Sequence, residues 1–147
     1  MGKSLLFFLS SIFVFSSFGL KETEITWFTL RDVVFTKTWN EEVRMMMDVP
    51  EFGPLVEALN GETVTIKGFV IPYDKSTDLW VLSENPFASC FFCGGAGPET
   101  VMSLYFKDKE VAGFHTDDYV TVKGVFRLNK MDVFELAYRL EDAEIVK

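Results

Sequence analysis

The residues with the clearest chemical potential are the only two cysteines of the chain, Cys90 and Cys93. Two phenylalanines, Phe91 and Phe92, separate them, and the glycine-rich run 94–98 follows. Two thiols at this spacing can close a small disulfide ring, take part in thiol–disulfide exchange, or bind a soft metal as thiolates. The simplest interpretation is a structural disulfide or a pair of packed thiols, with the phenylalanines anchoring the loop and the glycines providing its turns.

A metal site needs more ligands than these two sulfurs. Structural zinc takes four protein ligands, and catalytic zinc takes three plus a water. The single histidine, His115, lies beside Asp117 and Asp118 in a different predicted loop. A zinc or copper site is completed only if the two loops meet. Its ligands are then Cys90, Cys93, His115 and one aspartate, Asp117 or alternatively Asp118. The spacing does not require such a meeting, and a lone histidine beside aspartates is more often a solvated loop residue.

Thiol–disulfide exchange is a further alternative for the cysteine pair. In thioredoxin-like enzymes the first cysteine lies at the N-terminus of a helix, whose positive end stabilises the thiolate. Here the glycines and the proline directly after Cys93 interrupt any helix, and no alternation of strands and helices surrounds them. The sequence therefore disfavours an oxidoreductase.

Other catalytic motifs are missing from the sequence. It contains no Gly-x-Ser-x-Gly elbow, no Walker loop and no dinucleotide-binding glycine fingerprint. The three consecutive methionines 45–47 suggest copper, yet successive side chains of a strand point to opposite faces, so we expect them to pack in the core. No complete catalytic constellation can be assembled.

Charge argues against a nucleic-acid partner. The chain carries a formal net charge of -8, and its lysines and arginines alternate with acidic residues instead of forming a basic stripe. Proteins that bind nucleic acids gain affinity by neutralising phosphates with clustered basic residues. We therefore expect a protein or small-molecule partner.

The first 20 residues have the pattern of a secretory signal. Lys3 provides the charged start, and an apolar run follows over residues 4–18. That run is too short to span a bilayer comfortably, although an uncleaved anchor remains the alternative. We expect cleavage near residues 17–20, export to the periplasm or the medium, and no membrane span in the mature chain.

Residues 21–60 are predicted to form an N-terminal extension. One strand is expected to contain Trp27, Leu30, Val33 and Phe35, and residues 43–47 are expected to pair with it across a turn. A short helix is predicted to begin near Pro54 and to end at Gly61, because proline suits the first helical turn and glycine tolerates a left-handed backbone.

Residues 61–147 are predicted to form a barrel. Alternating apolar residues predict five strands, at 62–71, 79–82, 101–106, 119–128 and 134–140. Gly68 and Gly124 lie at matching points of the first and fourth strands, where a glycine permits the strong bend that closure requires. The predicted fold class is mainly β: a small five-stranded OB-like barrel with a short helix and an N-terminal extension.

The first barrel strand carries a family resemblance. Its pattern, Gly-x-x-Val-x-Ile-x-Gly-Phe-Val-Ile-Pro over residues 61–72, resembles the opening strand of OB-type barrels in exported bacterial proteins of unknown function. There a Trp-x-x-Leu, a Pro-x-Phe and a Leu-x-Gly segment precede the strand, as residues 27–30, 50–52 and 59–61 do here. The resemblance covers most of the mature chain and implies fold and export, but no activity.

OB barrels use the face of their second and third strands for ligands, which selects Trp80 and Tyr105 as candidate binding residues. Phe91 and Phe92 form a candidate lip beside that face. The sequence thus predicts an exported, non-enzymatic binding or accessory module that contacts an envelope protein or a small ligand through the loop 90–98 and the adjoining barrel face. A metal-handling protein and a thiol–disulfide oxidoreductase are the alternatives.

Overall fold

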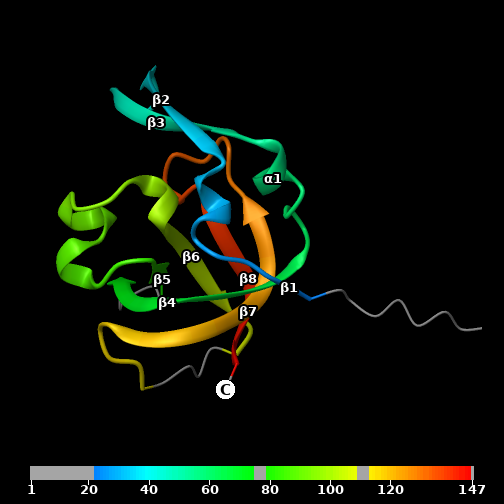
Figure 1. The fold of residues 1–147 in the computed structure, drawn as a ribbon. Helices are drawn as coiled ribbons and strands as arrows, with labels where there is room; N and C mark the ends of the chain where they lie inside the picture. Colours follow the sequence, from blue (N-terminus) through cyan, green and yellow to red (C-terminus); the bar gives the residue numbers. More distant parts are fainter. Residues whose placement is uncertain (1–21, 75–78, 109–112, 147) are drawn as a thin grey trace, which may run out of the picture.

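The computed structural model describes residues 22–74, 79–108 and 113–146. Five strands form a closed barrel, and the elements of the N-terminal extension precede it in the chain (Figure 1). The barrel strands are β4 (Thr63–Asp74), β5 (Leu79–Ser83), β6 (Val101–Phe106), β7 (Asp118–Leu128) and β8 (Tyr138–Val146). The predicted fold class, mainly β with a small five-stranded barrel, is confirmed.

The barrel closes because β4 pairs with two neighbours. Its first part pairs with β7 and its last part with β5, while the remaining order runs β5-β6-β8-β7. Neighbouring strands are antiparallel except β6 and β8, which are parallel. This closed five-stranded order is that of an OB-type barrel.

The two glycines lie where strands approach each other most closely. A Cβ atom on Gly68 would lie 2.7 Å from the carbonyl oxygen of Ser83 in β5, and one on Gly124 would lie 2.7 Å from the carbonyl oxygen of Glu141 in β8. The register between β7 and β8 also shifts beside Gly124. Only glycine fits at these two corners without displacing the neighbouring strand.

The barrel interior is filled by side chains from all five strands. Phe126 and Tyr138 are fully buried, with ring centroids 5.6 Å apart. The other fully or almost fully buried interior residues are aliphatic or methionine: Val64, Ile66, Val70, Leu82, Met102, Leu104, Val122 and Leu140.

The N-terminal extension adds side chains to this core. After β1 (Thr23–Glu24), which pairs parallel with β4, Trp27 and Leu30 are buried against the barrel. The prediction of one strand through these two residues is wrong: the Leu30 amide bonds the Trp27 carbonyl, and the 3₁₀ turn η1 (Thr29–Arg31) follows. Residues three apart share one side of a 3₁₀ turn, so both side chains reach the core.

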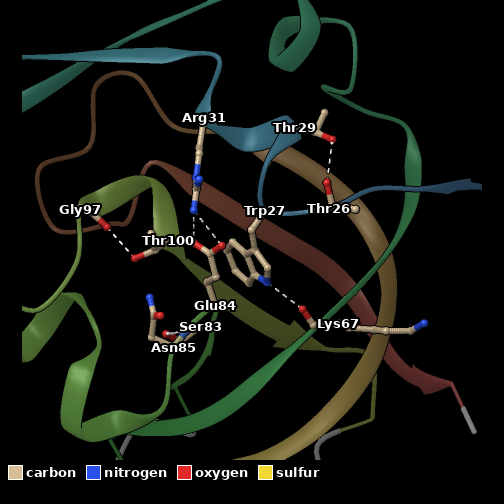
Figure 2. A network of polar contacts seen from close by, with 10 residues as sticks. All are labelled: Thr26, Trp27, Thr29, Arg31, Lys67, Ser83, Glu84, Asn85, Gly97 and Thr100. Atoms are coloured by element: carbon tan, nitrogen blue, oxygen red, sulfur yellow. Dashed lines mark hydrogen bonds and ion pairs between the residues drawn. The ribbon is translucent and has the colours of Figure 1, made fainter.

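Polar contacts fasten the extension to the barrel (Figure 2). The Trp27 indole N–H donates to the Lys67 carbonyl oxygen in β4 at 2.7 Å, and Arg31 forms an ion pair at 3.0 Å with Glu84, just after β5. In β8, the buried hydroxyl of Tyr138 donates to the Leu30 carbonyl at 2.7 Å. The extension is therefore part of the barrel's packing.

The rest of the extension is a hairpin and a short helix. β2 (Val33–Asn40) and β3 (Met45–Phe52) form a separate two-stranded antiparallel sheet that projects from the barrel (Figure 1). The predicted helix is confirmed as α1 (Pro54–Glu57), and Gly61 follows with a φ of 91°. Among the described residues, no helix has the length and apolar character needed to cross a membrane.

The last predicted strand is misplaced. β8 begins at Tyr138, and the preceding residues belong to a loop, 129–137, in which Phe134 is 79% exposed. The Asn129 side-chain amide donates to the carbonyls of Asp132 and Glu135, which holds these residues in turns. Side-chain hydrogen bonds of this kind compete with strand pairing. The residues before Tyr138 therefore form a loop, although they alternate like a strand.

We expect Gly68→Ala and Gly124→Ala each to lower the free energy of unfolding by about 1–3 kcal/mol, because the added methyl group meets a backbone carbonyl that cannot move without opening the barrel. Urea denaturation measures the loss. Lys67→Ala, at the exposed position beside Gly68, is the control and should change stability by less than about 0.5 kcal/mol. Equal stabilities for Gly68→Ala and Lys67→Ala would contradict the close approach.

We expect Tyr138→Phe to destabilise the chain by about 1–3 kcal/mol, because the buried Leu30 carbonyl loses its donor. Tyr119→Phe is the matched control: its ring is exposed, and no hydrogen bond of its hydroxyl is found in the described part of the chain. Thermal or urea unfolding of the two variants side by side tests whether the extension is fastened through this bond.

Candidate functional site

The cysteine loop, residues 84–100, folds back over the outer face of the barrel. It contains three single turns, η2 (Phe87–Ser89), η3 (Phe91–Cys93) and η4 (Pro98–Thr100). Cys90 is fully buried in a second small apolar cluster with Ile71, Val81 and Val101, which come from β4, β5 and β6. Phe91 packs against the same cluster. Cys90 therefore anchors the loop, and Phe91 is held in place beside it.

Both cysteines are free thiols, but Cys93 is exposed at the surface of this loop whereas Cys90 is buried. The Sγ of Cys93 donates to the Phe87 carbonyl oxygen at 3.1 Å. Desolvation, followed by the interaction with Cys90, raises the pKa of the Cys93 thiol. Catalytic thiols need a lowered pKa, because the thiolate is the nucleophile. The glycine at position 94, with a φ of 74°, ends η3 directly after Cys93, as the sequence predicted.

The other two proposed metal ligands, His115 and Asp117, lie in the connection before β7. The His115 side chain is 89% exposed, and its Nδ1 is 3.7 Å from the Asp118 carboxylate. The Asp117 carboxylate accepts a hydrogen bond from the backbone N–H of Phe87 at 2.6 Å, which ties the connection before β7 to the start of the cysteine loop. Within residues 22–74, 79–108 and 113–146, no three His, Cys, Asp or Glu side chains are arranged to hold a metal ion.

Trp80 and Tyr105 do not share a surface. Trp80 packs on the barrel core, with its ring 5.8 Å from that of Phe114. Tyr105 is partly exposed and donates from its hydroxyl to Glu135. Desolvation and this carboxylate raise the pKa of Tyr105 to about 12. The cysteine loop buries Val81 of β5 and Val101 of β6 under Cys90, so this part of the outer face is occupied by the chain's own residues.

Phe91 and Phe92 point to different neighbours. The Phe92 ring lies tilted against Tyr73 at the end of β4, with the ring centroids 4.9 Å apart, and the two phenylalanine rings meet edge to face at 5.5 Å. Phe91 instead lines a groove on the other side of the loop. Of the predicted lip, Phe91 lines this groove and Phe92 does not.

That groove has a volume of about 410 Å³ and lies between three segments: the β2–β3 hairpin, the loop 129–137 and the cysteine loop. The cysteine loop contributes Phe91 and Pro98. Its other apolar lining residues come from the hairpin and from the loop 129–137: Phe35, Met46, Met47, Val49, Pro50, Met131, Val133, Leu136 and Ala137. The groove is the concave apolar surface beside the cysteine loop.

Sequence reasoning missed the hairpin and the loop 129–137 as parts of a site. It assigned Met45–Met47 to the core, which is wrong for Met45 and Met46, since more than half of each residue is exposed. Met46 and Met47 line the groove together with Met131. Methionine is a flexible side chain that suits adaptable binding surfaces. The cluster 45–47 was therefore the available signal, and it was read as packing.

In the reduced chain, we expect iodoacetamide to modify Cys93 and to leave Cys90 untouched, because Cys90 is buried. The raised pKa lowers the thiolate fraction of Cys93 near pH 8, so its modification should be slower there than that of a cysteine in an unstructured peptide. The difference should vanish well above the thiol pKa. Peptide mass mapping over a pH series gives both results, and fast modification of Cys90 would contradict the anchoring role.

The cysteine loop, the hairpin and the loop 129–137 thus all contribute to this groove. Its lining is mainly apolar, and six polar or charged residues of the hairpin and the loop 129–137 also line it: Asn40, Asp48, Asn129, Lys130, Asp132 and Glu135. No protein-family model, curated protein or solved structure matches this chain.

Proposed function

We propose that the chain is an exported, non-enzymatic binding module that holds a segment of a partner protein or a small ligand in the groove beside the cysteine loop. The observation that carries the proposal is the groove itself. Its volume of about 410 Å³ lies within the range of ligand sites, which are concave and mostly apolar with a few placed polar groups.

The surroundings of the groove favour binding. The hairpin exposes Val34, Trp39, Met45, Met46 and Val49. Soluble proteins rarely leave so many apolar side chains together in solvent unless the surface meets a partner. Because Phe91 is held by the second apolar cluster, one wall of the groove is firm, whereas the hairpin wall is attached to the core chiefly through Val33 and Phe52. A firm wall opposite an adaptable, methionine-rich wall suits partners of varied shape.

Export is the second part of the proposal, and it is supported by the charged and apolar pattern of residues 1–20. In an oxidising compartment the neighbouring thiols of Cys90 and Cys93 would close a short disulfide ring. Such a ring would brace the turn that carries Phe91, so the thiol pair would serve the groove as a structural element.

The experiment is selection of peptides from a displayed random library on the immobilised chain, followed by affinity measurement on matched variants. Met46 lines the groove and is 52% exposed, whereas Val34 is 63% exposed on the same hairpin but does not line it. We expect Met46→Asp to weaken the selected peptides by about 10-fold or more, because a bound peptide would bury the new carboxylate. Val34→Asp should change their affinity by less than about twofold.

Unfolding temperatures of both variants check that neither disturbs the barrel. If the selected peptides bind Met46→Asp as tightly as the wild type, or if the two variants lose affinity equally, the groove is not the binding site.

A further inference from the structure

One edge of β3 faces the groove. Within residues 22–74, 79–108 and 113–146, β3 pairs with β2 only, in a sheet of two strands. Five consecutive residues, Met46 to Pro50, line the groove. Side chains of a strand alternate between its two faces, so a run of consecutive residues lines one groove when the edge of the strand faces it. The backbone of β3 is therefore presented to whatever occupies the groove.

The register shows which backbone groups this edge offers. Asp32 and Gly53 continue the β2–β3 pairing, and the Gly53 N–H donates to the Asp32 carbonyl at 2.8 Å. Antiparallel pairs alternate between bonded and non-bonded positions, so the even-numbered residues of β3 point their N–H and C=O away from β2. Met46 and Asp48 thus offer both groups outward. Pro50 also occupies an outward position. Its missing N–H therefore removes no hydrogen bond between β3 and β2.

The opposite wall, formed by the loop 129–137, carries two acidic side chains that have no ion-pair partner among the described residues. Four charged side chains line the groove. Two are paired within the chain: Lys130 lies 2.8 Å from Glu57, and Asp48 lies 3.5 Å from Lys37. The other two, Asp132 and Glu135, take part in none of the ion pairs among the described residues. An occupant with cationic side chains would be attracted to this wall.

We infer that the occupant of the groove is an extended segment of a partner protein, apolar with basic residues, that pairs its backbone with Met46 and Asp48 of β3. The inference rests on the proposed function and deepens it. Strand addition to an exposed edge is a general mode of peptide recognition, in which backbone bonds give affinity and alternate side chains give specificity. Here the apolar side chains contact the methionines and Phe91, and the basic side chains reach Asp132 and Glu135.

The test uses a six-residue peptide of alternating valine and lysine, titrated into the ¹⁵N-labelled chain. We expect the amide signals of Met46 and Asp48 to shift and their hydrogen exchange to slow. Asp48→Pro removes the outward N–H, and Asp48→Asn removes the same charge but keeps that N–H. The proline variant should bind about 10-fold more weakly than the asparagine variant, since it loses a backbone bond and obstructs the edge.

Two further peptides complete the test. A valine–glutamate peptide should bind about 10-fold more weakly than the valine–lysine peptide, and the difference should shrink as salt rises. A valine–lysine peptide methylated on the amides that would face β3 should lose affinity to a similar extent. Unchanged barrel amide signals in Asp48→Pro confirm that the barrel of this variant is folded. We expect this result because the same edge already carries a proline two residues further along, Pro50.

The outcomes separate the two proposals. Equal binding by Asp48→Pro and Asp48→Asn, or no binding of the valine–lysine peptide, overturns the strand pairing. The groove then remains the binding site if library peptides still discriminate Met46→Asp from Val34→Asp. If the valine–lysine peptide binds but Met46→Asp and Val34→Asp have the same affinity for the library peptides, the binding site lies elsewhere and both proposals fail.

Discussion

The closure of the barrel on β4 is the constraint on which the rest of the structure depends. This strand must pair with β7 along its first part and with β5 along its last part, so it has to bend strongly between them. Gly68 lies within this strand, where a side chain would strike β5. Once β4 is bent, its alternate residues are divided between two apolar surfaces: Val64, Ile66 and Val70 face the barrel interior, and Ile71 faces outward.

The outward apolar surface needs a cover, and this need explains the cysteine loop. Ile71, Val81 and Val101 would lie in water on the outside of the barrel, and their burial is favourable in proportion to the apolar area removed from water. The loop after β5 returns across them and buries Cys90 in their midst. In this position a cysteine acts as a small apolar residue. The chemistry suggested by two closely spaced thiols is thus accompanied by a packing role, and that role places Phe91 beside the groove.

The sequence predicts the barrel well and the groove poorly, for different physical reasons. The strands β4 to β7 follow from alternation and from Gly68 and Gly124, which are local signals. β8 was misplaced because Asn129 closes a loop over residues that alternate like a strand. The groove brings Met46 and Met47 next to Met131, more than 80 positions later in the chain. No local pattern encodes that meeting, which follows from barrel closure and from the way the extension packs on it.

The hairpin that forms one wall of the groove is stabilised unevenly. Near the barrel, Val33 and Phe52 pack against the core, whereas Trp39 and Met46 at the far end are largely exposed. An isolated two-stranded hairpin is at best marginally stable in water, and a third strand or a packed face is needed for more. The far half of β2 and β3 has neither within the described chain. The strand addition proposed above would supply both the missing ladder and the missing apolar contact. Binding would then also stabilise this half of the hairpin, and the methionine-rich wall could adjust to the bound segment.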